Sequence, residues 1–314
     1  MLTIDPKEAG NKESFKYLVG AVGPRPIAFV STISEDGINN LSPFSFFNCF
    51  GSNPPVLAFS PSRRGRDNTV KDTYNNLLAT KECVIHVVTY SIVEQMNLSS
   101  TEFPSDVDEF PKSGFTPLDS DLVKAKRVKE SPVHFECKLM QMVELGGQAG
   151  SGNLAICEVV KIHINEAVIN EKGGIDPFKL DLVGRNGGNW YTRANGEALF
   201  ELPKPDGIGV GYDSLPDFIK NSKILTGNNL GSLSLIHEIP SDFDVNSFIN
   251  AIEKNGQGMV EFNIYEDDLD HENMLATALS INENYSLLER TAKIAIENNE
   301  REFAWKTLLY SSKA

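Results

Sequence analysis

Cysteine is scarce in this sequence, and its positions exclude two kinds of protein. The four cysteines, Cys49, Cys83, Cys137 and Cys157, form no C-x-x-C pair and no dense framework. This excludes a small disulfide-stabilised secreted scaffold and a zinc site built from cysteine pairs. A few free thiols suit a reducing compartment, so we expect a cytoplasmic protein.

Long hydrophobic runs are also missing. The most apolar early stretch, residues 17–30, is interrupted by glycine, proline and arginine, and it is shorter than the roughly 20 residues that span a bilayer. Residues 1–14 are polar and mixed in charge. We therefore expect an irregular leader there rather than a secretory signal, and no membrane partner.

Positive charge is in short supply. The chain has 29 lysines and arginines against 43 acidic residues, a net charge of −14. This balance disfavours nucleic acid and anionic membrane surfaces as partners. After residue 206 the excess of acid is greatest, whereas residues 60–73 carry a surplus of bases. An acidic protein that binds a phosphorylated ligand needs such a basic island.

The common catalytic signatures are absent as well. No P-loop, G-x-S-x-G or H-E-x-x-H motif occurs. The five histidines are scattered without the spacing of metal ligands. We therefore expect no metal site, and the sequence assigns no catalytic acid, base or nucleophile.

Short apolar runs separated by turn residues fill the first two-thirds of the chain. Strands are predicted at 26–32, 40–50, 56–60, 83–89, 133–143 and 154–165. Asp36-Gly37 predicts a hairpin between the first two strands. Residues 69–80 have helical spacing, and 101–121 are typical of a long loop. The many strands indicate a closed antiparallel barrel.

After about residue 212 the apolar spacing becomes helical. Val245, Phe248, Ile249 and Ile252 follow an i, i+3, i+4, i+7 pattern, and residues 285–296 and 303–309 predict two more amphipathic helices. We expect two domains: residues 1–206, mainly β, and residues 207–314, an acidic, mainly helical C-terminal extension.

Three segments of the β part carry side chains suited to one ligand. They are Arg25 to Thr32, the aromatic stretch Asn40 to Phe50, and the basic stretch Ser60 to Thr73. An aromatic strand that Pro43 leaves partly unpaired can hold a flat heterocycle. Hydroxyls, cations and a helix N-terminus can hold a phosphate. Together the segments predict an FMN site, although core phenylalanines and a solvated basic loop are simpler interpretations of two of them.

Several motifs in order resemble the flavin reductase-like family of FMN-binding split barrels, the class that includes flavoredoxins. The matching residues cover about 15–236 and include Gly23-Pro24-Arg25-Pro26-Ile27-Ala28, Asn40 to Asn48, Lys71-Asp72-Thr73, Asn97, Asp108-Glu109-Phe110, Ser131-Pro132-Val133, Gly184-Arg185 and Leu225 to Gly231. The resemblance implies a six-stranded antiparallel Greek-key barrel that forms a homodimer with FMN at the subunit interface. The chain beyond about residue 240 falls outside it.

The segments and the resemblance together give a set of expected cofactor-binding residues. These are Arg25, Pro26, Ser42, Pro43, Phe44, Ser45, Ser60, Arg63, Arg66, Asn68, Lys71, Asp72, Thr73, Asn97 and Arg185.

The expected function is that of an FMN-binding oxidoreductase of the flavin reductase type, which passes hydride between NADH or NADPH and the flavin. Two alternatives stay open. One is a non-catalytic FMN-binding electron carrier or sensor. The other gives the helical tail the main role, as a protein-interaction module. The fold alone does not decide among them, because one fold hosts many activities.

Overall fold

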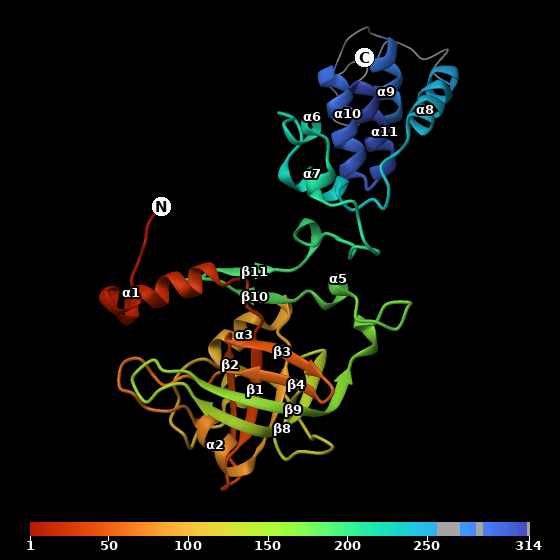
Figure 1. Ribbon diagram of the computed structural model, residues 1–314. Coiled ribbons are helices and arrows are strands. Elements are labelled where there is room, and N and C mark those ends of the chain that lie inside the picture. Colours follow the sequence, from red (N-terminus) through yellow and green to blue (C-terminus); the bar gives the residue numbers. More distant parts are fainter. Residues whose placement is uncertain (256–270, 281–284, 313–314) are drawn as a thin grey trace. The chain divides into compact units, whose positions relative to one another are not determined.

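The computed structural model describes residues 1–255, 271–280 and 285–312 (Figure 1). The chain divides into two compact units, residues 1–200 and 201–314. Across these described ranges, no helix is both long enough and apolar enough to cross a membrane.

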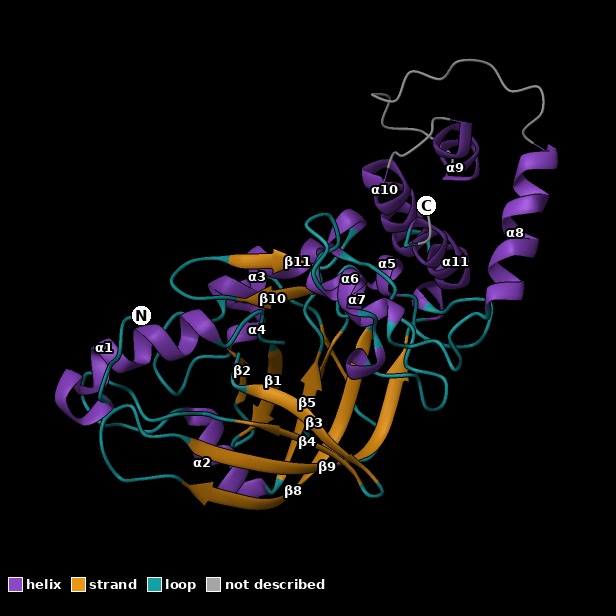
Figure 2. Cartoon of the chain, turned by 45° about the horizontal axis from the view of Figure 1, so that its top comes forward, coloured by secondary structure: helices purple, strands orange, loops and turns teal. Residues whose placement is uncertain are grey.

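The N-terminal unit is built on one antiparallel sheet of seven strands in the order β2-β1-β5-β8-β9-β4-β3. The strands curve around a common interior (Figure 2). Their bounds are β1 Ala28–Ile33, β2 Asn39–Phe44, β3 Phe47–Ser52, β4 Pro55–Phe59, β5 Glu82–His86, β8 Val133–Glu144 and β9 Asn153–Ile164. The expected hairpin is confirmed, since β1 and β2 pair antiparallel across the turn at Gly37.

The expectation of a six-stranded, closed barrel is wrong. The stretch from Asn40 to Phe50 forms two strands, β2 and β3, divided by a bend at Ser45 and Phe46. These strands occupy the two ends of the strand order, so the hydrogen-bonded sheet is open between them. Pro43, which has no N–H to donate, lies on the edge strand β2, where that loss is tolerated.

Both faces of the sheet are covered. On β1, Ala28 and Val30 point into the interior cluster with Phe59 and Leu77. Phe29 points to the other face and packs with Met96 and other residues of a second cluster. Because successive residues of a strand face opposite sides, a strand buried on both faces has few polar positions.

The N-terminal unit also contains several short elements outside this sheet. They are α1 Pro6–Ala21, α2 Asp72–Thr80, α3 Val93–Leu98, α4 Glu109–Ser113 and α5 Pro177–Leu180, with the two-residue strands β6 Pro117–Leu118 and β7 Arg127–Val128 and the hairpin β10 Val183–Arg185 and β11 Tyr191–Arg193. The helix expected at 69–80 is confirmed as α2, which begins three residues later.

The irregular leader expected over residues 1–14 is wrong, because α1 begins at Pro6. The Asp5 side chain accepts the N–H of Lys7 at 2.8 Å, and Pro6 occupies the first helical position. Both are start signals of a helix. The helix buries none of its own residues. Its sequence therefore lacks the apolar spacing from which a helix can be predicted.

The C-terminal unit is helical, as expected. Its helices are α6 Asp217–Lys220, α7 Gly227–Leu233, α8 Asp242–Asn255, α9 His271–Ser280, α10 Tyr285–Glu297 and α11 Arg301–Ser311. Trp305 is fully buried at its centre, and its indole N–H donates to the carbonyl of Leu233 at 2.9 Å. The unit therefore has a core of its own.

Candidate functional site

The aromatic and basic segments lie side by side in the N-terminal unit. Ser60 donates its backbone N–H to the carbonyl of Phe46 at 2.9 Å, and the Thr73 hydroxyl donates to Asn40 Oδ1 at 2.7 Å. Lys71 Nζ lies 5.7 Å from the centre of the Phe44 ring. The two segments thus meet at three points, which is the juxtaposition on which the expected site depends.

Internal hydrogen bonds fix the shape of the basic segment. Asn68 has a φ of 62°, a conformation that asparagine tolerates better than most residues. Its side chain accepts from Arg63 Nε at 2.9 Å, and Arg64 Nη1 donates to the carbonyl of Val70 at 2.6 Å. Within the described part of the chain, the Nη groups of Arg63 meet no hydrogen-bond acceptor. They are available to an anion.

Lys71 precedes the first turn of α2. Its side chain is half-buried, and burial lowers its pKa, with a further lowering by the nearby Arg64. A cation held in this state gains strongly from a bound anion. The first N–H groups of α2 add donors and a favourable dipole, although Asp72 shares that turn. The donors present therefore fit the phosphate group of FMN.

A pocket of about 180 Å³ unites four of the expected residues, and it is lined by Ile27, Pro43, Ser45, Met96, Asn97, Ser100, Arg185 and Tyr191. The Arg185 guanidinium lies 4.5 Å from the centre of the Tyr191 ring. An apolar floor with hydroxyl, amide and guanidinium groups at its rim suits the edge of a flat, polar-edged heterocycle.

Arg25 borders this pocket but is bound to the protein itself. Its guanidinium donates to the carbonyls of Val19 at 2.7 Å and Asn186 at 3.0 Å and to that of Val22, while Nε lies 3.5 Å from Ser45 Oγ. Burial lowers its pKa, and Arg185 lowers it further. Arg25 thus fixes the end of α1 and the loop after β10 beside the pocket.

Other expected residues lie in different surroundings. The Ser60 hydroxyl accepts the backbone N–H of Asn153 at 3.2 Å, and Phe44 packs in the interior cluster. Pro26 and Arg66 are exposed, and Arg66 pairs with Glu102 and Asp67. Ser42 is half-buried on β2. The expected residues that remain candidates for contact with a ligand therefore lie in the basic segment and in the pocket.

The sequence did not indicate that a buried carboxyl, that of Glu109, is bonded to the aromatic segment. Its oxygens accept from Asn40 Nδ2 and from the backbone N–H of Leu41, each at 3.1 Å. The same Asn40 accepts from Thr73 and Thr32, so Glu109 belongs to a network that joins β2 to α2. Burial raises its pKa to about 7. The motif Asp108-Glu109-Phe110 signalled the position but not this contact.

Comparison with a family model matches residues 22–179 to the flavin reductase like domain. A curated relative, an uncharacterized protein of Aquifex aeolicus, is 43% identical over 196 residues, which are 62% of this chain and 97% of that protein.

Solved structures show the same likeness. Nitrilotriacetate monooxygenase component B from Bacillus cereus aligns with a TM-score of 0.60 at 34% identity, covering 64% of this chain and 98% of that one. The 2-nitrobenzoate 2-nitroreductase NbaA of Pseudomonas fluorescens aligns with a TM-score of 0.57 at 26% identity, covering 66% and 100%. These matches leave about a third of this chain uncovered.

Proposed function

This chain belongs to the flavin reductase-like domain family, and from that premise we propose that it is an FMN-dependent oxidoreductase that takes hydride from NADH or NADPH. The observation that carries the proposal is the contact between the basic segment and the aromatic strand, at Ser60 with Phe46 and Thr73 with Asn40. The bound flavin would supply the redox chemistry, and the protein would supply position and charge.

The residues of the chain divide this work between them. Arg63, Lys71 and the start of α2 hold the phosphate. Pro43 and Ser45 present the edge strand to the ring, and Arg185 places a positive charge near it. A cation beside the flavin favours the anionic reduced ring, which makes the flavin easier to reduce.

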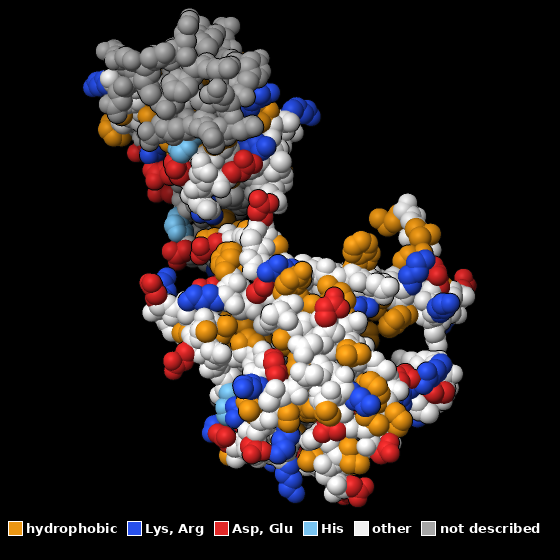
Figure 3. Space-filling view, turned by 180° about the vertical axis from the view of Figure 1, so that it is seen from behind, with side chains coloured by type: hydrophobic (Ala, Val, Ile, Leu, Met, Phe, Trp, Pro, Cys, Tyr) orange, Lys and Arg blue, Asp and Glu red, His pale blue; other side chains and the backbone are white. Residues whose placement is uncertain are grey.

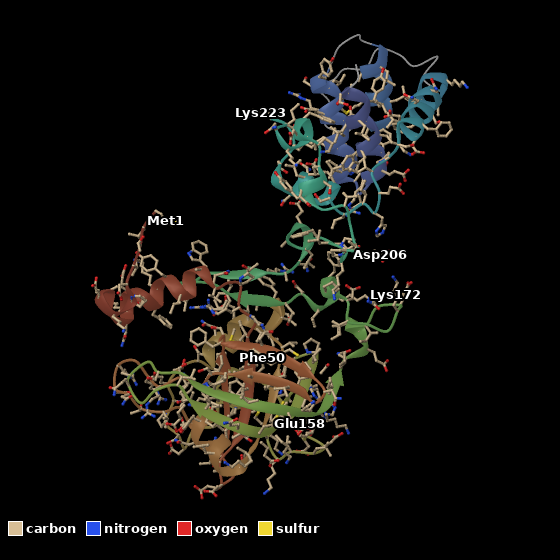
Figure 4. The ribbon with its side chains drawn as sticks, in the orientation of Figure 1. Met1, Phe50, Glu158, Lys172, Asp206 and Lys223 are labelled. Carbon is tan, nitrogen blue, oxygen red and sulfur yellow. The ribbon has the colours of Figure 1, made fainter. Side chains whose placement is uncertain are left out.

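We propose further that two copies of the chain associate. Hydrophobic side chains reach the surface of the N-terminal unit at many points (Figure 3). Phe50, on the edge strand β3, is 68% exposed (Figure 4), and Leu18 of α1 is 62% exposed. An uncovered edge strand with apolar side chains favours pairing with another chain. The four cysteines are free thiols, which agrees with a cytoplasmic setting for this dimer.

The phosphate contact can be tested by comparing FMN with riboflavin, which lacks the phosphate. We expect Lys71→Gln to weaken FMN binding about tenfold or more, the usual effect of a lost charge-assisted hydrogen bond, and to leave riboflavin binding unchanged. Lys81→Gln removes the same charge just beyond the other end of α2 and serves as the control. Equal losses for both flavins would refute the assignment of Lys71, and failure of the wild-type chain to bind FMN would refute the proposal itself.

The activity has its own test. Addition of NADH or NADPH to the FMN-bound protein should bleach the flavin absorbance, with one oxidised nicotinamide formed for each reduced flavin. Bound FMN that neither nicotinamide reduces would assign the chain to the electron carriers or sensors instead. Removal of residues 240–314 with no change in FMN content would show that flavin binding does not need this part of the chain.

A further inference from the structure

A second hollow in the N-terminal unit has the chemistry of a small-anion site. It measures about 400 Å³ and is lined by Arg127, Lys129, Ser131, Pro132, His134, His163, Ile164 and Asn165. Its lining contains two permanently charged cations and no carboxylate. In a chain whose net charge is −14, such a concentration of positive charge calls for a reason.

The acids around the hollow make their ion pairs with other groups, although the charge of Arg127 helps to lower the pKa of Asp119 and of Asp121. Asp119 pairs with Lys126 at 2.5 Å and Asp121 with Lys161, while Glu136 Oε1 lies 2.6 Å from His163 Nε2. Arg127 donates Nε and Nη2 to the backbone carbonyl of Asp119. Among the residues that the structure describes, neither Arg127 nor Lys129 has an ion-pair partner.

His134 supplies the second observation. It is 6% exposed, and its Nε2 lies 2.7 Å from the carbonyl of Ser131, so Nε2 carries a hydrogen. Its other ring nitrogen, Nδ1, is buried and has no hydrogen-bond partner in the described part of the chain. A buried polar atom without a partner costs free energy, of the order of 1–3 kcal/mol. A ligand that makes a hydrogen bond to Nδ1 would recover it.

The position of His134 is held by a row of residues across the sheet. Pro43, Phe29, His86, His134 and His163 are successive cross-strand partners, so their side chains share one face. His86 donates Nδ1–H to the carbonyl of Phe29 at 2.7 Å and accepts the N–H of Val128 at 3.0 Å. The His86 and His134 rings are 5.2 Å apart. His134 therefore cannot turn away from the hollow at low cost.

We propose that this hollow binds the phosphate group of a small phosphorylated ligand. Arg127 offers a planar pair of donors of the kind that phosphate oxygens accept, and Lys129 adds a mobile charge. A doubly charged phosphate would also favour a proton on His134 Nδ1, which would then donate to it. The carboxylates of Asp121 and Glu136 with His163 lie within 4.8 Å of one another, but their ion pairs and the nearby cations disfavour a metal ion there.

The protonation of His134 gives a readout specific to the site. Burial lowers its pKa, and the charge of Arg127 and the nearby His163 lower it further, against the backbone interactions with Ser131 and Val128, which raise it. His86 on β5, Glu136 on β8, Lys129 and Asp121 are the other titratable groups near it in the described part of the chain. A bound dianion should move the pKa of His134 upward.

The experiment uses the full chain and follows the NMR signals of its imidazole groups. Inorganic phosphate can also occupy the flavin phosphate site, but binding there should not alter the His134 and His163 signals, so these signals report on the hollow. Titration with inorganic phosphate should shift the His134 and His163 signals in a saturable way, and acetate at equal ionic strength should not. Adenosine 5′-monophosphate as a second probe separates the sources: tighter binding than inorganic phosphate indicates a nucleotide, and equal binding indicates that the phosphate group alone is recognised.

The matched variants decide the assignment. Arg127→Gln with Lys129→Gln should weaken phosphate binding about tenfold or more, and Lys129→Gln alone, at an exposed position, about threefold. Lys124→Gln with Lys172→Gln removes two charges elsewhere on the unit (Figure 4 labels Lys172) and should leave binding within twofold. The proposal would be overturned if the wild type shows no saturable shift. It would also be overturned if the double variant, Arg127→Gln with Lys129→Gln, binds phosphate as tightly as the wild type. Neither result depends on whether the chain binds FMN.

Discussion

Glu109→Gln should remove a specific part of the pH dependence of stability. The Glu109 carboxyl is 6% exposed and accepts hydrogen bonds from Asn40 and Leu41, and burial raises its pKa from 4.5 to about 7. Between these two pH values the folded chain holds a proton that the unfolded chain has released. The free energy of unfolding must therefore fall as the pH rises through this window.

The magnitude follows from the size of the shift. Each unit corresponds to about 1.4 kcal/mol, so a rise from 4.5 to about 7 gives a loss of about 3 kcal/mol between pH 4 and pH 8. Glu109 lines a polar pocket, and solvent there makes this an upper value. The carboxyls with lowered pKa, such as Asp67 at about 2, lose their contribution only at more acidic pH and stay outside the window.

The assay is urea or thermal unfolding at pH 5, 6, 7 and 8 for the wild type, Glu109→Gln and the exposed control Glu94→Gln. Glutamine carries no charge at any of these pH values. We expect the stability of Glu109→Gln relative to the wild type to rise by about 2–3 kcal/mol from pH 5 to pH 8, and the control curve to run parallel to the wild type. Parallel curves for Glu109→Gln as well would refute the reasoning.

Two further substitutions test the packing of each unit. Thr73→Val removes the hydroxyl that donates to Asn40 at 2.7 Å and should lower the free energy of unfolding of the N-terminal unit by about 1 kcal/mol. Thr101→Val, at an exposed position, is the control and should change this free energy by much less. An equal loss in both variants would contradict the hydrogen-bond network around Asn40. Gly209→Ala would place a Cβ 2.5 Å from a backbone carbonyl oxygen, whereas Gly231 has open space around it. Calorimetry should show a lower transition temperature of the C-terminal unit for Gly209→Ala but not for Gly231→Ala, and an unchanged transition for both would show that the close contact is absent in solution.

Features set by local periodicity were predictable from the sequence. The hairpin at Asp36-Gly37, the helix α2 and the tail helices α8, α10 and α11 follow from turn residues or apolar spacing, whereas α6, α7 and α9 were not predicted. The bend at Ser45 and Phe46 was hidden because no glycine or Asn-Gly pair marks it within the aromatic run. A count of strands from hydrophobic runs therefore gave one strand too few for the seven-stranded sheet.

Features set by contacts between distant residues were not predictable. The sequence placed Arg25 next to the ligand, but its hydrogen bonds go to carbonyls at positions 19, 22 and 186, which nothing in the local pattern reveals. Likewise, a glutamate next to Phe110 gives no indication that it is buried against Asn40. Burial decides the pKa of such a group, and burial is a property of the fold.

The open seam between β2 and β3 has a consequence for the motion of the chain. Edge strands exchange their amide hydrogens with solvent readily, because part of their N–H groups have no neighbour strand. A ligand that lies along Ser42 to Ser45 would take up those groups, so exchange should slow in β2 and β3 while the central strands β5 and β8 stay as they are. The amide exchange rates of β2 and β3 would then report whether a ligand is bound between these strands, without any coloured or redox-active probe.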